Sequence, residues 1–267
     1  MNGALFRHTW RTQGLKLVIV STALAIWGFV LPIIYARFGS QFRAILDSGF
    51  LPPQFAKLGG ADIFSLPGAI ALSLIHPISI ILTSVFAVGF ATSAIAGERE
   101  QGTLEVTLSR PISRRTLYLT LLAATFGFVA VTITALLAGG VAGSVYAGVI
   151  AEFPIRHVPL LFLNSVLLFG SFAAVGLAAS VSFDRLAPAM GTTLGFVVVM
   201  YFLEILGGLW PAAEKLQPYS LFHYLAAKSI LLGNTARFDL AVLAAVIAVA
   251  VAWALVVFPR RDLAAPS

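Results

Sequence analysis

The sequence predicts an all-α integral membrane protein, and three observations support this fold class. Hydrophobic residues make up 59% of the 267 residues and charged residues only 10%, whereas soluble domains usually carry about 25% charged residues. Apolar runs of about 20 residues recur along the chain, the length that a helix needs to cross a bilayer core of about 30 Å. These runs do not alternate between apolar and polar residues as the strands of a membrane β-barrel do. Lipid is therefore the expected solvent for most of the chain.

We expect six transmembrane helices that together form one domain over residues 17–260, followed by a short tail over residues 261–267. The predicted spans are Leu17–Tyr35, Ala69–Ala96, Leu117–Val141, Val158–Val181, Pro188–Trp210 and Leu240–Phe258. The second span is longer than a crossing requires and contains Pro77, which predicts a kink or an interfacial lead-in. The pairs Gly139/Gly143 and Gly191/Gly195 have a spacing that lets helices approach closely.

Residues 1–16 precede the first span and predict an amphipathic helix at the membrane interface. Leu5, Phe6 and Trp10 would face lipid. The polar face, which would meet the headgroups, consists of Arg7, His8 and Arg11. The alternative is a frayed, basic lead-in to the first span.

Two other segments outside the spans have helical or apolar character. After the first span, Phe38, Phe42 and Ile45 recur at helical spacing and predict a helix lying on the outer bilayer surface, which Pro52 would end. Before the last span, residues 219–233 (YSLFHYLAAKSILLG) are too apolar for an ordinary loop and too short to cross the membrane. We expect this segment to re-enter the membrane or lie flat on it, either as a helix or covered by protein.

The basic residues predict the orientation. Six spans put both termini on one side, and the segments on that side hold ten lysines and arginines against seven on the other side, in fewer residues. The positive-inside rule therefore places both termini in the cytoplasm, with the chain in the cell membrane. Candidate anchors at the membrane interface are Trp10, Arg11, Arg114, Arg115, Arg260 and Arg261. Because the basic residues do not gather on one face, the net charge of +6 does not indicate nucleic-acid binding.

The sequence lacks the motifs of common catalytic and metal sites. It contains no cysteine, no phosphate-binding P-loop and no Gly-x-Ser-x-Gly motif. Its four histidines are far apart, so no metal site is predicted. We therefore expect a non-catalytic chain with no cofactor and no metal of its own.

Two polar residues within the predicted spans are candidates for a translocation path. Glu204 lies toward the outer end of the fifth span and Asn164 lies in the fourth. Ionisable groups inside a membrane are costly to bury and commonly functional. The alternative is structural: Glu204 protonated or bonded to a neighbour such as Tyr201, and Asn164 linking helices.

The most charged stretch, residues 97–115 (GEREQGTLEVTLSRPISRR), lies between the second and third spans. It carries four arginines and three glutamates on residues that favour a short helix. We expect Gly102 to interrupt that helix, Pro111 to end it and Ser113 to cap the next one. An ordinary positive-inside loop would explain the arginines but not the glutamates, which contribute little to topology. Mixed charge with a few apolar side chains suits docking to another protein.

Residues 96–105 (AGEREQGTLE) and 108–115 (LSRPISRR) resemble the signature of permease subunits of type-2 ATP-binding-cassette (ABC) exporters. The resemblance implies that the charged stretch is a coupling helix held in a groove on a separate ATPase. It also implies two ATPase subunits, which carry the ATP and magnesium, and a second permease, identical or related. The implied docking residues are Glu98, Arg99, Glu100, Gly102, Thr103, Leu104, Glu105, Arg110 and Pro111.

The function expected from this resemblance is the permease subunit of an ATP-driven exporter. The apolar spans favour hydrophobic or amphipathic substrates. The alternative is a stand-alone secondary carrier or channel, which needs no ATPase. An intramembrane enzyme is disfavoured because no paired catalytic groups can be assembled from the sequence.

Overall fold

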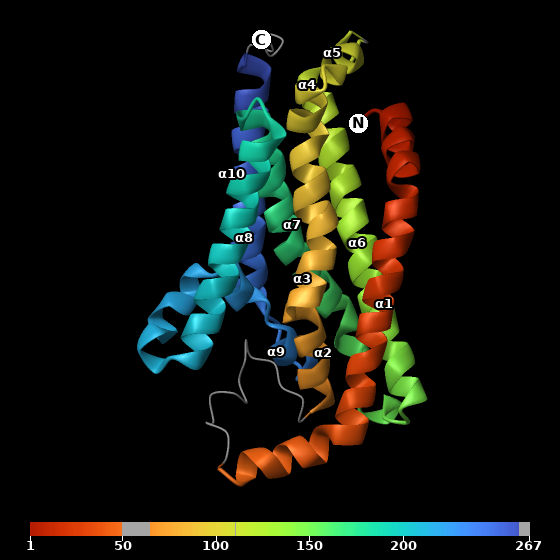
Figure 1. Ribbon diagram of the computed structural model, residues 1–267, viewed down its shortest axis with the longest axis vertical. Coiled ribbons are helices and arrows are strands. Elements are labelled where there is room, and N and C mark those ends of the chain that lie inside the picture. Colours follow the sequence, from red (N-terminus) through yellow and green to blue (C-terminus); the bar gives the residue numbers. More distant parts are fainter. Residues whose placement is uncertain (50–64, 110, 262–267) are drawn as a thin grey trace.

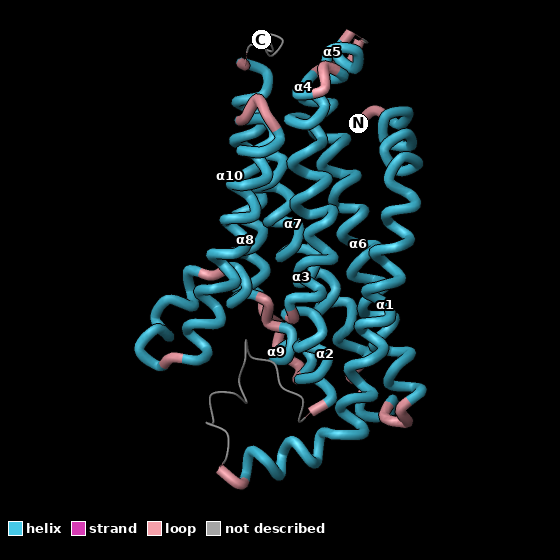
Figure 2. The backbone as a smooth tube through the Cα atoms, viewed as in Figure 1, coloured by secondary structure: helices cyan, strands magenta, loops and turns pink. Residues whose placement is uncertain are grey.

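The computed structural model describes residues 1–49, 65–109 and 111–261, and within these ranges the chain is helical with short connections and no strand (Figures 1 and 2). The long helices run side by side as one elongated bundle (Figure 1). In chain order the elements are α1 (Gly3–Asp47), α2 (Leu66–Ile75), α3 (Pro77–Ser84), the π-helices η2 (Val85–Phe90) and η3 (Ser93–Gly97), α4 (Glu98–Glu100), α5 (Thr103–Leu108), α6 (Arg114–Tyr146), the short 3₁₀-helices η4 (Ile150–Glu152) and η5 (Ile155–His157), α7 (Val158–Ser182), α8 (Leu186–Leu209), the 3₁₀-helices η6 (Pro211–Tyr219) and η7 (Leu221–Tyr224), α9 (Ala227–Leu231) and α10 (Arg237–Arg260).

The all-α membrane fold is confirmed. Among the described residues, five helices are long and apolar enough to cross a membrane: α1, α6, α7, α8 and α10. A sixth crossing is formed if α2 and the helix Pro77–Phe90, which meet at 44°, count as one span. The break falls at His76, whose backbone is extended (ψ 142°) because the following Pro77 disfavours the helical conformation there. The kink predicted at Pro77 is therefore confirmed.

The N-terminus, α4, α5 and the last turn of α10 all lie at the same end of the bundle (Figure 1). We call this end the terminal end and the opposite one the distal end. The distal end holds α9 and the last turns of α1 (Figure 1). The charged stretch and both ends of the described chain therefore share one side, as an even number of crossings requires.

Residues 1–16 are helical, as predicted, but they form no helix of their own, because α1 continues through this stretch without a break. Its apolar side faces the bundle instead of lipid. The ring of Trp10 lies 4.8 Å from that of Phe128 on α6 and fills the space that a side chain at Gly127 would need. Trp10 is thus a packing residue between two helices.

The far part of α1 turns away from the bundle and runs across its distal end (Figure 1). Phe38, Phe42 and Ile45 are exposed on this part. The predicted helix after the first span therefore forms as a continuation of α1 beyond Tyr35. Pro52, which was expected to end it, lies outside the described residues.

Glycines set the distance between α1 and α6. A Cβ atom at Gly139 would overlap the carbonyl oxygen of Ala25, and one at Gly143 would overlap that of Phe29. Gly28 meets the backbone of α6 in the same way from the other side. The first predicted glycine pair thus mediates a close helix contact. The second pair, Gly191 and Gly195, instead has open space where a side chain would be.

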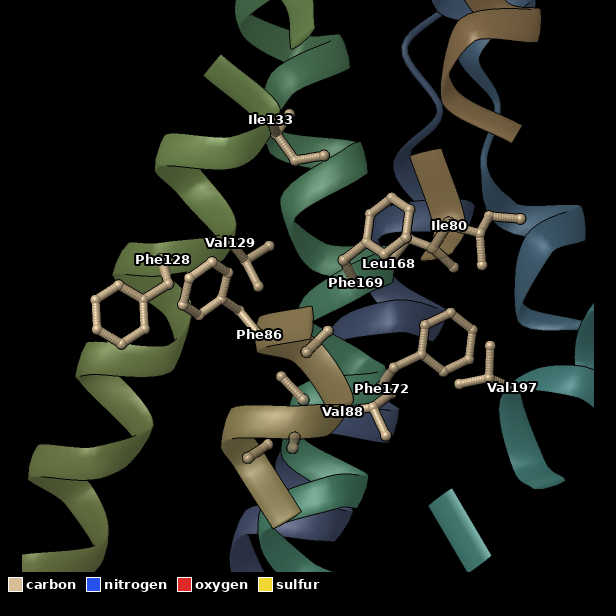
Figure 3. Packing of buried hydrophobic residues seen from close by; sticks show 14 of the residues in the cluster. Ile80, Phe86, Val88, Phe128, Val129, Ile133, Leu168, Phe169, Phe172 and Val197 are labelled. Atoms are coloured by element: carbon tan, nitrogen blue, oxygen red, sulfur yellow. The ribbon is translucent and has the colours of Figure 1, made fainter. Parts of the chain in front are cut away.

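Helix α7 lies at the centre of the bundle. Two thirds (67%) of the most apolar 18-residue stretch of this helix is buried, whereas only 11% of the corresponding stretch of α10 is. It contacts α6, α8, α10 and the π-helices. Figure 3 shows Phe172 of α7 reaching toward Val197 of α8, and Phe86 of η2 next to Phe128 of α6, with ring centroids 4.9 Å apart. Aromatic side chains thus link successive helices across the core.

The apolar segment before α10 packs against the bundle as η7 and α9, whereas η6, which precedes it, is largely exposed. Phe222 is buried (1% exposed) with its ring 5.2 Å from Phe172 and 5.4 Å from Tyr201. Leu221 of η7 and Ala227, Ile230 and Leu231 of α9 are buried as well, so these short turns are largely covered by protein, as irregular backbone at membrane depth requires.

Candidate functional site

The charged segment, residues 97–115, begins on a backbone that α7 holds in place. The hydroxyl of Ser180 donates to the carbonyl of Thr92 (2.7 Å) and accepts from the amide nitrogens of Ala96 (2.8 Å) and Ile95 (3.2 Å). A π-helix interrupts the regular hydrogen-bond ladder, and the groups it leaves need partners. Ser180, which is 1% exposed, supplies them. The start of the charged segment is therefore fixed to the central helix.

Two short helices, α4 and α5, form most of the charged segment. Gly102 separates α4 from α5 with φ +73°, a left-handed conformation that glycine adopts without strain. Across this turn the Thr103 hydroxyl donates to the carbonyl oxygen of Glu98 (3.1 Å) and to its carboxylate. Ser113 then caps α6, accepting from the amide of Thr116 at 3.1 Å. The interruption at Gly102 and the cap at Ser113 are confirmed.

Three of the predicted docking residues are used inside the chain. Leu104 is 3% exposed and belongs to the hydrophobic core. Glu100 accepts from the amide of Leu186 at 2.9 Å, the first residue of α8, where a carboxylate is favoured by the free amides and dipole of a helix N-terminus. Arg99 contacts Asp184 in the connection between α7 and α8 at 2.6 Å. These contacts hold the segment against α8.

The other described residues of the set face solvent. Glu98, Thr103 and Glu105 are exposed, as are Gly102 and Pro111. Arg110 lies outside the described residues. Beside them Val106 is 66% exposed, an apolar side chain without cover in this chain.

A groove of about 460 Å³ lies next to this exposed face, between the start of α1 and the end of α5. Leu5, Val106 and Ile112 supply apolar walls, and His8 contributes a polar one. The terminal end therefore offers carboxylates, an exposed valine and a groove side by side.

Asp184 and Arg261 complete the side of the charged segment that packs against the bundle. Neither residue was predicted from the sequence as a partner of this segment. The Asp184 carboxylate also contacts Arg261 at 2.5 Å, and Arg261 donates to the carbonyl of Val181 at 2.8 Å. The charged segment, the α7–α8 connection and the end of α10 thus meet at one carboxylate. A signal was available: Asp184 is the sole acidic residue in a short connection on the same side as the charged stretch.

The predicted interface anchors divide into two groups. Arg114 donates from one guanidinium nitrogen to the carbonyls of Phe258 (3.1 Å) and Arg261 (2.6 Å), so it joins the start of α6 to the end of α10. Arg11, Arg115 and Arg260 are exposed. The structure therefore gives Arg114 and Arg261, like Trp10, contacts within the bundle.

The two polar residues of the spans lie apart. Asn164 is fully buried and donates from Nδ2 to the carbonyl of Tyr224 at 2.9 Å, which ties α7 to η7. Glu204 is 4% exposed and lines a cleft of about 710 Å³ at the distal end. Among the described residues, the side-chain amide of Gln217 donates two long hydrogen bonds to Glu204. One reaches Oε1 at 3.4 Å and the other reaches the backbone carbonyl oxygen at 3.5 Å. The structural interpretation of Asn164 is thus supported by its contact, whereas Glu204 faces a cavity.

No group of three or more metal-ligating side chains occurs among the described residues. A bundle of membrane-crossing helices, with a mixed-charge helical pair projecting at the end that holds both ends of the described chain (Figure 1), is the architecture of a polytopic membrane protein. The chain belongs to the ABC-2 family of transporter proteins, whose family model matches residues 15–263. It is therefore a membrane permease subunit of an ABC transporter. Among curated proteins none shows significant similarity to the chain.

Proposed function

We propose that the chain is the permease of an ATP-driven exporter and that a separate ATPase subunit docks on α4 and α5. The observation that carries the proposal is the division of the charged segment into two sides. Glu105 and Val106 face solvent, whereas Arg99 and Glu100 bond to the α7–α8 connection and the start of α8. A partner that moves the outer side therefore moves α8 through short charged contacts.

The ATPase subunits, two in each complex, hold the ATP and magnesium in this proposal. Charged groups at the rim would set register and partner choice, and Val106 with the adjoining groove would supply apolar contact. The terminal end then lies in the cytoplasm of the cell membrane, with both termini on that side. The cargo is hydrophobic or amphipathic and is moved outward.

A second permease, identical or related, completes the complex through α8. Gly191 and Gly195 have open space where a side chain would be, and neighbouring Leu194, Val198 and Phe202 are exposed. Small residues on an exposed transmembrane face allow another helix to approach closely. Gly195→Leu would therefore lower self-association in detergent, measured by light scattering, without lowering the melting temperature of the permease.

The docking proposal is tested with the permease extracted gently from native membranes together with the ATPase that accompanies it. Glu98→Arg combined with Glu105→Arg reverses two exposed charges and leaves Arg99 and Glu100 in place. We expect the copurified ATPase to decrease about tenfold or more, since like charges placed across an interface cost several kcal/mol. The melting temperature of the permease should stay within about 2 °C, because surface substitutions change stability little.

Glu152→Arg is the matched control, since it reverses an exposed carboxylate at the distal end that, like Glu98, accepts a hydrogen bond from a hydroxyl of its own chain, here from Tyr35 at 2.7 Å. It should leave copurification unchanged. If native extraction yields no ATPase with the wild-type chain, the stand-alone carrier or channel becomes the better description. Equal copurification of the double variant would remove α4 and α5 as the docking surface.

A further inference from the structure

The cleft at the distal end has an unusual charge distribution for a cavity between membrane helices. It is bounded by the end of α8, by η6 and by the segment from η7 to the start of α10. Three carboxylates line it, Glu204, Glu214 and Asp239, against one lysine, Lys228. Carboxylates therefore outnumber the lysine among the residues that line this cleft.

Glu204 is the carboxylate that points to a ligand. It is 4% exposed, yet its Oε2 atom has no hydrogen-bond partner among the described residues. The ion pairs between side chains of the described residues, Arg99–Asp184 and Arg261–Asp184, do not include Glu204. The amide of Gln217 reaches Oε1 only at 3.4 Å, near the limit of a hydrogen bond. A buried carboxylate oxygen normally has partners, and leaving one without costs free energy comparable to a lost hydrogen bond to a charged group.

Part of the cleft wall is apolar. Ala71 and Ile75 of α2 and Phe222 and Leu225 of the stretch from η7 to α9 line it, together with polar side chains such as Gln217 and His223. A ligand that fits must therefore combine an apolar body with a group that complements a carboxylate. A cation does this best, because opposite charges interact strongly where water is partly excluded.

We infer that this cleft binds a cationic amphipath, with its ammonium group at Glu204 and its apolar body against Phe222 and Leu225. The inference rests on the proposed function in one respect: it names the chemical class of the permease's substrate. Glu214, which is exposed, lies at the rim and contributes less than Glu204 does.

The experiment measures binding to the purified full-length permease in nanodiscs of zwitterionic lipid, without any ATPase. The probe is 4-phenylbutylammonium, whose N–H groups can donate to Oε2 of Glu204, and the matched compound is its uncharged isostere in which carbon replaces the nitrogen. We expect the wild-type chain to bind the ammonium compound at least about tenfold more tightly. Glu204→Gln should abolish this preference, Glu204→Asp should retain it, and Glu152→Gln, outside the cleft, should leave it unchanged.

Two outcomes overturn the inference: equal affinity of wild type for both compounds, or an unchanged preference in Glu204→Gln. The first comparison uses only wild-type protein, so it holds even if a variant misfolds. Because ATPase is absent from the assay, its result is independent of docking. Binding without copurified ATPase would contradict only the proposed function, and copurified ATPase without charge-selective binding would contradict only this inference.

Discussion

The carboxylate of Asp184 lies 2.6 Å from the guanidinium group of Arg99 and joins the charged segment to the connection between α7 and α8. The same oxygen lies 2.5 Å from Arg261 at the end of α10. One side chain therefore links α4 both to the α7–α8 connection and to the end of α10. In the proposed transporter this is the route by which the ATPase would move the bundle.

The first prediction concerns this ion pair. Asp184 is about half exposed (56%), so the pair should contribute only about 0.2–1 kcal/mol to stability. Asp184→Asn should lower the melting temperature by a few degrees at most while strongly reducing substrate-stimulated ATPase activity. In a double-mutant cycle with Arg99→Gln, measured by that activity, the two losses should not add. Additive losses would show that the two residues act separately.

The second prediction concerns the hydroxyl of Ser180. Ser180→Ala removes the partner of three backbone groups of the π-helical region and leaves them buried. We expect a loss of about 1–3 kcal/mol, since buried polar groups without partners carry the full cost of desolvation. Thr134→Ala is the control, because its hydroxyl is exposed and bonds only to its own helix. Thermal unfolding in detergent should show a clear decrease for the first variant and little change for the second.

The third prediction separates the two glycine pairs. Gly139→Ala places a methyl group onto the backbone of Ala25 and should destabilise the α1–α6 contact by about 1–3 kcal/mol. Gly191→Ala enters open space and should be neutral or slightly stabilising, because alanine favours helix over glycine. Similar melting temperatures for both variants would contradict the close approach of α1 and α6.

The fourth prediction compares neighbouring arginines at the start of α6. Arg114→Gln loses charge-assisted hydrogen bonds to the carbonyls at the end of α10 and should cost about 1.5–3 kcal/mol. Arg115→Gln, at an exposed position, should change stability by less than about 0.5 kcal/mol. Limited proteolysis should cut the C-terminal tail faster in the first variant alone. Equal cutting in both would show that Arg114 does not hold α10.

Much of the fold was predictable because its causes are local. Hydropathy marked the membrane-crossing helices, Pro77 marked the break in the second span, and Ser113 marked the cap of α6. The charged segment was located from its mixed signs and from its resemblance to a family pattern, and the match over residues 15–263 confirms the family. Its role as a coupling helix stays a prediction.

The functional assignment of individual residues was less predictable. Leu104 had the same sequence signal as Val106, yet one is in the core and the other is exposed. Trp10 had the pattern of a lipid-facing residue but contacts α6. Such outcomes depend on which neighbour a side chain meets, and helix periodicity does not specify that neighbour.

The amino-acid order thus decided that the chain crosses a membrane as helices and where most of those helices begin, because transfer of apolar side chains into lipid and capping of helix ends depend on residues close in sequence. Tertiary packing decided that Asp184 joins Arg99 to Arg261, that Ser180 completes the π-helical region, and that Glu204 lines a cleft. Each of these relations links residues far apart in the chain, and it exists only once the helices have taken their places in the bundle.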